Sequence, residues 1–214
     1  MSYGDFSMGG RVIGYFRPKS AQFQQSRYNR RMMLNPMSSA VLGKRIMVVG
    51  TSSSGKTTLA KQLSSHLGYP HVELDALNWD PDWTESPDFA QRVDEQTRSD
   101  TWVSCGNYSR VRHILWERAD TAVWLDYPLW LNYWRLTKRM FRRVMLREEL
   151  WNGNRESLRM MLSKDSLYVW IWQTHARRRR EYGAIIANNE TPTISWIHLQ
   201  SPRQTNAWLR SVHT

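Results

Sequence analysis

The sequence contains a single cysteine, Cys105, among its 214 residues. One thiol excludes an intrachain disulfide framework, and it also excludes a zinc site built on several cysteines. Such sparse cysteine usage is typical of a reducing compartment. The chain also has no apolar run near the roughly 18 residues that a membrane span needs, and no signal-peptide core. We therefore expect no membrane-spanning segment and no membrane partner.

Acidic residues are almost missing from the first part of the chain. Residues 1–45 contain eight Lys or Arg residues and one acid, Asp5, and no Trp precedes Trp79 although the chain has 12. This composition predicts a basic, disordered extension over residues 1–43 and a folded body over residues 44–214. Because the extension is also rich in Arg and Ser, a mitochondrial transit peptide is the alternative. We expect a cytoplasmic protein, with mitochondrial import as the second reading.

Short buried strands alternate with helices along the body. Apolar, β-branched runs that end at turn residues predict the strands, and apolar residues three or four positions apart predict the helices. This alternation is typical of an α/β fold in which helices cover both faces of a parallel sheet. The strands that we expect are residues 46–49, 71–75, 101–105, 121–126 and 193–199.

Serine–proline pairs and one long apolar stripe predict where three helices lie. Ser86–Pro87 and Ser201–Pro202 each combine an N-cap residue with a proline suited to the first helical position. A third helix is expected from residue 129 to about residue 146, where apolar side chains recur on one side.

The stretch GTSSSGKT matches the phosphate-binding pattern G-x-x-x-x-G-K-[ST] at every required position. Its glycines permit a backbone path whose N–H groups, with the N-terminus of the next helix, cradle phosphates. Lys56 should reach the β- and γ-phosphates, and the Thr57 hydroxyl should bind Mg²⁺. The sequence therefore predicts ATP and Mg²⁺ as cofactors, held by Gly50, Thr51, Ser52, Ser53, Ser54, Gly55, Lys56 and Thr57.

Two acids follow predicted strands and are candidate partners of the loop. Asp75 can hold a water on Mg²⁺ or orient an acceptor hydroxyl, because ligands of open α/β sheets bind outside the carboxyl ends of strands. Asp126 ends an apolar strand as a Walker-B acid does. An ordinary turn or cap role is the alternative for both residues.

Arginines beyond Pro128 bear on the type of reaction. Arg135, Arg139, Arg142 and Arg143 recur at helical spacing, which is usual for a solvated basic face. The functional alternative is a cationic lid over about residues 135–165, extended by Arg147 and Arg155, that offsets charge on a transferring phosphoryl group. A second run, residues 177–180, cannot face one way on a helix, so some of its arginines are expected to be solvated.

Tryptophans near basic residues also suggest nucleic acid, because bases stack on aromatic rings. Trp102, Trp124 and Trp196 lie inside predicted strands, so we expect them in the core. The loop residues Trp79, Trp83 and Trp151 are better candidates for contacting a ring of the substrate, with rim packing as the alternative.

Three stretches carry a family resemblance: HVELDALNWDPDWTE, WVSCGNYSRVR and ADTAVWLDYP. Together with the Arg-rich helix, they resemble the adenylate-kinase-like P-loop proteins of the topology-modulation-protein group over about residues 45–211. The resemblance implies a three-layer α/β/α sandwich with a five-stranded parallel sheet, and Mg-ATP-dependent phosphoryl transfer under a mobile lid. It also implies site roles for Thr58 at the phosphates, Arg203 beside the adenine, Asp75 near metal or acceptor, and Arg135, Arg139 and Arg143 next to the lid.

One position departs from the group. Where its members usually show aspartate before Gly-Asn-Tyr, this chain has Cys105 before Gly106-Asn107-Tyr108. Aspartate there would hold a water on Mg²⁺, and a thiol does not suit this hard cation. The leading hypothesis is a nucleotide or small-metabolite kinase, monomeric or homodimeric, whose small-molecule acceptor lies between Asp75, Asn107–Tyr108 and the loop tryptophans. The alternatives are a nucleic-acid-associated ATPase and a nucleotide-binding protein that has lost turnover.

Overall fold

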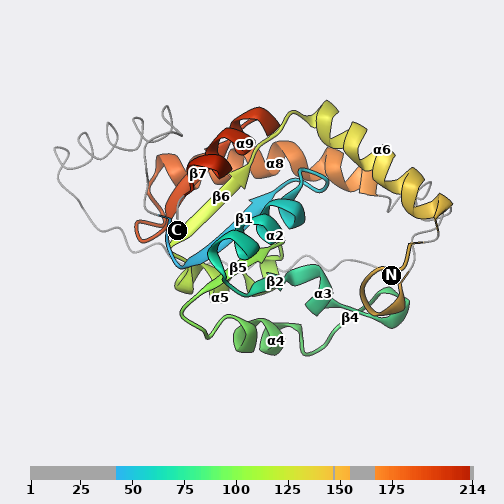
Figure 1. Cartoon of the computed structure of the whole chain (residues 1–214), viewed down its shortest axis with the longest axis horizontal. Coiled ribbons are helices and arrows are strands. Elements are labelled where there is room, and N and C mark those ends of the chain that lie inside the picture. The colour runs from blue at the N-terminus through green and yellow to red at the C-terminus, as the bar shows by residue number, and fades with distance from the viewer. Residues whose placement is uncertain (1–41, 147, 155–166, 213–214) are drawn as a thin grey trace, which may run out of the picture.

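The fold is a three-layer α/β/α sandwich around a five-stranded parallel sheet (Figure 1). The computed structural model describes residues 42–146, 148–154 and 167–212. The strands pair in the order β2-β5-β1-β6-β7, and every neighbouring pair is parallel. The predicted fold class is therefore confirmed, with strands at β1 Arg45–Gly50, β2 His71–Glu73, β5 Trp102–Cys105, β6 Thr121–Leu125 and β7 Ser195–Leu199.

Alternate side chains of the central strand β1 divide the core into two layers. Met47 and Val49 belong to one buried cluster, and Ile46 and Val48 belong to the other. The first cluster packs under α4 Phe89–Gln96, α5 Arg112–Arg118 and α8 Leu167–Ala187, and the second under α2 Lys56–Leu67 and α9 Pro202–Ser211. This two-sided burial explains the uninterrupted apolar runs of the strands.

Smaller elements lie between β2 and α4, before α5 and after α6. A two-stranded antiparallel sheet pairs Trp79 with Glu85 and Asp80 with Thr84, and the sequence reading missed it. Two-residue strands give no periodic signal. The remaining short elements are α3 Leu74–Asn78, β3 Trp79–Asp80, η1 Pro81–Trp83, β4 Thr84–Glu85, η2 Ser109–Val111 and η3 Trp151–Gly153.

The two Ser-Pro predictions had different outcomes. Ser201 caps α9 because its side chain accepts a hydrogen bond from the Gln204 backbone N–H, as predicted. The prediction at Ser86–Pro87 was wrong, because α4 begins at Phe89 with Asp88 as its N-cap. Ser86 is buried and donates its backbone N–H to Asn78 at 2.7 Å, so the chain finishes a long-range contact before the helix starts.

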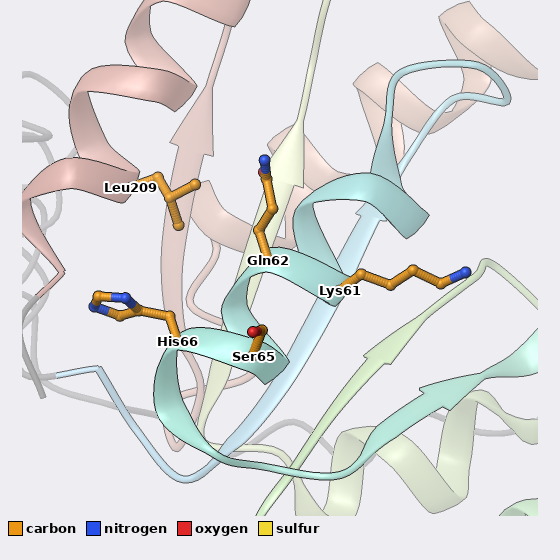
Figure 2. Close-up of a pocket in the computed structure, with 5 residues that line it drawn as sticks. All are labelled: Lys61, Gln62, Ser65, His66 and Leu209. Carbon is orange, nitrogen blue, oxygen red and sulfur yellow. The ribbon is translucent and has the colours of Figure 1, made fainter.

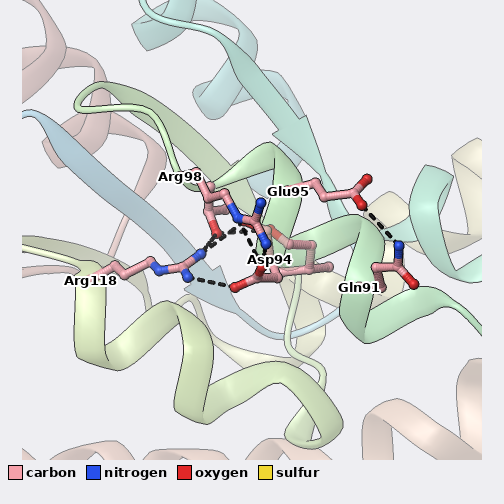
Figure 3. A network of polar contacts seen from close by, with 7 residues as sticks. Gln91, Asp94, Glu95, Arg98 and Arg118 are labelled. Carbon is pink, nitrogen blue, oxygen red and sulfur yellow. Dashed lines mark hydrogen bonds and ion pairs between the residues drawn. The ribbon is translucent and has the colours of Figure 1, made fainter.

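An ion-pair network joins α4 to α5 (Figure 3). The Asp94 carboxylate on α4 accepts hydrogen bonds from Arg98, just beyond the end of that helix, and from Arg118 at the end of α5. Both arginines hold the pKa of Asp94 below its ordinary value. Arg118 also donates to the backbone of Asp94 and to Thr97. The network therefore fixes the end of one helix to the end of the other.

The long helix α6 Leu129–Met145 lies beside α8 and extends away from the sheet with it (Figure 1). Leu136 and Met140 from α6 and Ile171 from α8 form a third buried cluster between the two helices. The predicted apolar stripe of α6 is thus confirmed. Residues 1–41, 147 and 155–166 lie outside the described residues, and with them the basic extension, most of the predicted lid after α6, Arg147 and Arg155.

Candidate functional site

The predicted phosphate-binding loop follows β1 and leads directly into α2. Gly50 has φ +146°, and a Cβ there would lie 2.5 Å from the Leu125 carbonyl oxygen on β6, so only glycine fits. Gly55 is the N-cap of α2 in the left-handed region, and no side chain caps the helix. The hydroxyls of Ser53 and Ser54 are buried without a hydrogen-bond partner. Uncapped helix N–H groups and unpaired hydroxyls are the donors that a bound phosphate needs.

Lys56 points back over this loop, where its ammonium group donates to the Thr51 carbonyl at 3.0 Å. Burial and, after it, the nearby positive charge of Arg178 lower its pKa from 10.5 to about 8, although the negative charge of Asp75 opposes the shift. An anion bound at the loop would supply the opposite charge that this crowded cation lacks.

Asn107 holds the first glycine of the loop from the neighbouring strand end. Its side-chain amide oxygen accepts from the Gly50 N–H at 3.2 Å, and its amide nitrogen donates to the Gly50 carbonyl. Both ends of the side chain are thus engaged by the loop. These contacts make Asn107 a positioning residue for the loop, and its predicted place beside the acceptor stays a prediction.

Arginines from α6 and α8 converge on the same loop. Arg135 donates to the Ser54 carbonyl at 2.8 Å, and Arg139 is close enough to lower the pKa of Lys56. Arg178 is only 8% exposed and donates to Thr174 within α8, and its charge lowers the pKa of Lys56 more than the charge of Arg139 does. The loop is therefore surrounded by positive charge, which favours a polyanionic ligand.

Arg178 was missed because it lies inside a run of four arginines. Its spacing from the buried residues Ile171 and Tyr182, seven before and four after, would have placed it on the inner face of α8. The other three arginines of the run are exposed, and Arg179 pairs with Asp126. The run is thus no continuous basic face.

Two other predicted arginines are not brought to the loop by any described contact. Arg143 lies 3.8 Å from the Glu148 carboxylate, near the end of α6. Arg203 is exposed in the first turn of α9. The role of Arg143 at the phosphates and of Arg203 beside adenine stay predictions.

Asp75 lies in the first turn of α3, two residues after β2 ends, so the prediction of a strand through Asp75 was wrong. Its side chain is nevertheless at the expected edge of the sheet. Tyr108 donates its hydroxyl to Asp75 Oδ1 at 2.6 Å. Burial, followed by the negative charge of Asp75, raises the pKa of Tyr108, so the phenol stays a donor. The pair offers Oδ2 of the carboxylate to a further hydroxyl.

The three loop tryptophans lie together beside this pair. Trp83 contacts Trp79 and Trp151 edge to face, with ring centroids 5.7 Å and 6.4 Å away. Trp79 also hydrogen-bonds Tyr108. The cluster is half-buried, so it can both pack at the rim and present rings to a ligand. Trp102 and Trp124 are buried in the core as predicted.

Cys105 is the last residue of β5 and lies beside the loop, at the edge of the sheet where the sequence predicted it. Its Sγ is 3.6 Å from the Thr57 hydroxyl, the predicted Mg²⁺ ligand, and 3.4 Å from His71 Nε2. Burial raises the pKa of the thiol to about 12, so it is neutral at physiological pH. A neutral thiol thus lies next to the hydroxyl that the sequence predicts to bind Mg²⁺.

Asp126 fits neither of the two roles considered for it. Its carboxylate is buried and pairs with Arg179 at 2.9 Å and with His198 at 3.0 Å. These contacts join β6, α8 and β7. The Asp126 carboxylate therefore holds parts of the fold together, and it acts neither as a metal ligand nor as a simple turn residue.

His175 connects α8 to the loop and was also missed. Its Nδ1 lies 3.0 Å from the Thr51 hydroxyl. Burial, and then the charge of Arg179, lower the pKa of His175, which favours the neutral ring. Because α8 also carries Arg178, one helix holds both the second residue of the loop and a cation beside Lys56.

No group of three or more metal-ligating side chains occurs within residues 42–146, 148–154 and 167–212. Thr57 and Asp75 can still serve Mg²⁺, because this cation keeps several waters and takes few protein ligands together with phosphates. A hollow of about 610 Å³ lies elsewhere, along the second half of α2 and against α9 (Figure 2). It is lined by Lys61, Gln62, Ser65, His66 and Leu209, away from the N-terminal end of α2 that follows the loop.

No protein-family model and no curated protein matches the chain. Solved structures similar to it include a sugar kinase from a Janibacter species, with 18% identity, a TM-score of 0.42 and coverage of 79% of this chain and 96% of that one. A shikimate kinase from Bacteroides thetaiotaomicron has 14% identity, a TM-score of 0.47 and coverage of 78% and 94%. A gluconokinase from Sinorhizobium meliloti has 18% identity, a TM-score of 0.42 and coverage of 78% and 91%. At this similarity the reaction must be argued from the site itself, and the narrower topology-modulation resemblance stays a prediction.

Proposed function

We propose that the protein is a Mg-ATP-dependent phosphotransferase acting on a hydroxyl group of a small molecule. The observation that carries the proposal is the ring of cations around the glycine loop, next to a carboxylate. Arg135 bonds the loop, the charges of Arg139 and Arg178 lower the pKa of Lys56, and Asp75 is near enough to oppose that shift. Phosphoryl transfer needs this combination of charge stabilisation and a positioned acceptor.

The chain's own residues divide the work in this proposal. The N–H groups of the loop and the Lys56 ammonium would hold the phosphates, and the Thr57 hydroxyl would bind the metal ion. Bound Mg-ATP supplies the phosphoryl group and the metal's charge. Asp75 Oδ2 would accept the proton of the acceptor hydroxyl, while Tyr108 keeps Oδ1 occupied and the carboxylate oriented.

The arginines would position the loop or offset charge, and none of them would transfer a proton. Arg135, bonded to the Ser54 carbonyl, fixes the position of α6 against the loop. Arg139 and Arg178 would offset the negative charge that gathers on the transferred group. The solved structures similar to this chain are named as sugar, shikimate and gluconate kinases, which agrees with a small-molecule acceptor in general.

The test is transfer of labelled γ-phosphate to a panel of sugars, sugar acids, nucleosides and nucleotides. We expect a phosphorylated product from at least one acceptor. Lys56→Ala should lose both transfer and ATP-dependent thermal stabilisation, whereas Asp75→Asn should lose transfer and keep the stabilisation. Lys61→Ala, on the far side of the same helix, is the matched control. Intact ATP binding with no transfer to any acceptor would overturn the proposal.

Cys105 favours a second candidate, a nucleotide-binding protein with little turnover. Its neutral thiol, 3.6 Å from Thr57, cannot hold a water on Mg²⁺ as a carboxylate would. Cys105→Asp should then raise turnover, while Cys105→Ser should not. An unchanged rate in the aspartate variant removes this candidate.

The nucleic-acid alternative gains no support from the described residues, because the arginines of residues 177–180 are divided between the interior, an ion pair and solvent. The cytoplasmic location, mitochondrial import through residues 1–43, and a monomer or homodimer stay predictions.

A further inference from the structure

Exposed apolar side chains are concentrated on one part of the molecule. Among the described residues, every large hydrophobic side chain that is strongly exposed lies on α6, at its C-cap or in the first two turns of α8. Solvent-exposed apolar patches of this kind mark interaction sites. The residues of this patch are Trp130, Trp134, Phe141, Met145, Leu146, Val169, Trp170 and Trp172.

The patch on α6 is a continuous stripe opposite the helix's buried side. Trp130, Trp134, Phe141 and Met145 follow one another at intervals of four, seven and four residues, which places them on one face. They are between 59% and 69% exposed. The inner face of α6 already packs on α8 through Leu136 and its neighbours. The outer stripe is therefore not needed to hold the helix pair together.

The exposed cations of α6 are Lys138 and Arg142, because Arg135 bonds the loop and Arg139 acts on Lys56. The helix itself contains no acid, and Glu148 beyond its end pairs with Arg142. Lys138 is exposed within the stripe and lies over the Trp134 ring, 5.7 Å from its centroid. On α8, Arg177 and Arg180 are exposed as well. A surface with this charge is complementary to an anionic partner.

Two other occupants fit these observations less well. In a symmetric dimer through the stripe, the Lys138 side chains would approach each other with no acid on either α6 to pair with them. Single-stranded nucleic acid needs cations that track its backbone beside the stacking rings. Here Arg142, the other exposed cation on the outer face of α6, is already paired with Glu148 at 2.9 Å.

We propose that the outer face of α6, with the start of α8, binds the surface of an anionic phospholipid bilayer. Tryptophan suits the boundary between headgroups and acyl chains, because its ring is apolar and its N–H is polar. A helix with aromatic and aliphatic residues on one side and cations beside them lies in the plane of the interface. No helix in the described part of the chain is long and apolar enough to cross the bilayer. We expected no membrane partner because the sequence has no membrane-spanning segment, and binding to the surface of a bilayer does not need such a segment.

Sedimentation of the full chain with lipid vesicles tests the proposal. The probes are vesicles of phosphatidylcholine alone and of phosphatidylcholine mixed with phosphatidylserine. We expect binding to the anionic vesicles and at least about tenfold weaker binding for the double variant Trp134→Ser/Phe141→Ser. Trp134→Tyr/Phe141→Tyr, which keeps interfacial aromatic rings, should retain most of the binding. Lys138→Gln should weaken binding to the anionic vesicles, and Lys61→Gln, which removes a cation from α2, should not.

The double variant also separates this surface from residues 1–43, whose basic residues remain in every variant. Vesicle binding that is unchanged by Trp134→Ser/Phe141→Ser would belong to that basic segment and would overturn the proposal. The absence of binding to either kind of vesicle would overturn it too. The proposal would also fail if the wild type bound no vesicles and the double variant lost self-association or oligonucleotide binding, because the surface would then serve a protein or a nucleic acid. Far-UV circular dichroism checks that both double variants are folded.

Discussion

Replacing Lys56 by methionine should make the ligand-free protein more stable at neutral pH. Burial and Arg178 lower the pKa of Lys56 from 10.5 to about 8, so folding makes the charged lysine less favourable. At about 1.4 kcal/mol for each tenfold change in the proton equilibrium, this fall amounts to about 3 kcal/mol. The variant loses the hydrogen bond to Thr51, which contributes about 1 kcal/mol, and partial solvent access reduces the charge penalty. We expect a net gain of about 1–2 kcal/mol in the free energy of unfolding.

The pH dependence gives this prediction its sharpest form. Between pH 8 and pH 10.5 the unfolded chain binds the Lys56 proton more tightly than the folded chain does. The stability of the wild type should therefore rise relative to the variant as the pH increases through this window. Denaturant unfolding of both proteins at pH 7 and pH 10 measures the difference. A variant that is no more stable at pH 7, or a difference that does not shrink by pH 10, would refute the reasoning.

Three further changes test contacts around the loop and in the scaffold. Gly50→Ala should destabilise the protein by at least about 2 kcal/mol, because its Cβ would lie 2.5 Å from the Leu125 carbonyl, and equal unfolding midpoints would contradict this. Asn107→Ala should weaken ATP binding by about tenfold in calorimetry, since the Gly50 backbone loses both partners, and unchanged affinity would reject the positioning role. Asp94→Asn should lower stability above about pH 4, where the wild-type carboxylate is charged. The difference should fall as the pH drops below that range, because the pKa of Asp94 is depressed, and a difference that is constant with pH would argue against the ion pairs.

The parts of the fold that depend on local chemistry were predictable from the sequence. The loop and the helix between Gly50 and Gly68 could be predicted from the conformations that glycine permits and from the apolar repeat of the helix. The strands could be predicted from their apolar runs. The cap at Ser201 involves residues only three apart. These features need no knowledge of the rest of the chain.

The contacts that the sequence could not reveal join residues far apart along the chain. Asn107 reaches Gly50, and Arg178 reaches the surroundings of Lys56, only because the fold brings those segments together. Asp126 had the pattern of a metal-binding acid, yet its carboxylate forms an ion pair with Arg179 and lies within hydrogen-bond distance of His198. Whether a buried carboxylate is neutralised by other side chains depends on which residues the fold brings next to it. A sequence motif of one apolar strand followed by one acid therefore does not show whether the acid is free to bind a metal.

The central claim is that bound ATP is used to phosphorylate a small molecule rather than only held or hydrolysed. The most direct measurement compares the ADP formed with the phosphorylated acceptor formed, in the presence of each member of the acceptor panel. The account predicts equal amounts of the two products for at least one acceptor, and loss of both in Asp75→Asn. ADP formation that no acceptor increases, with free phosphate as the other product, would contradict it.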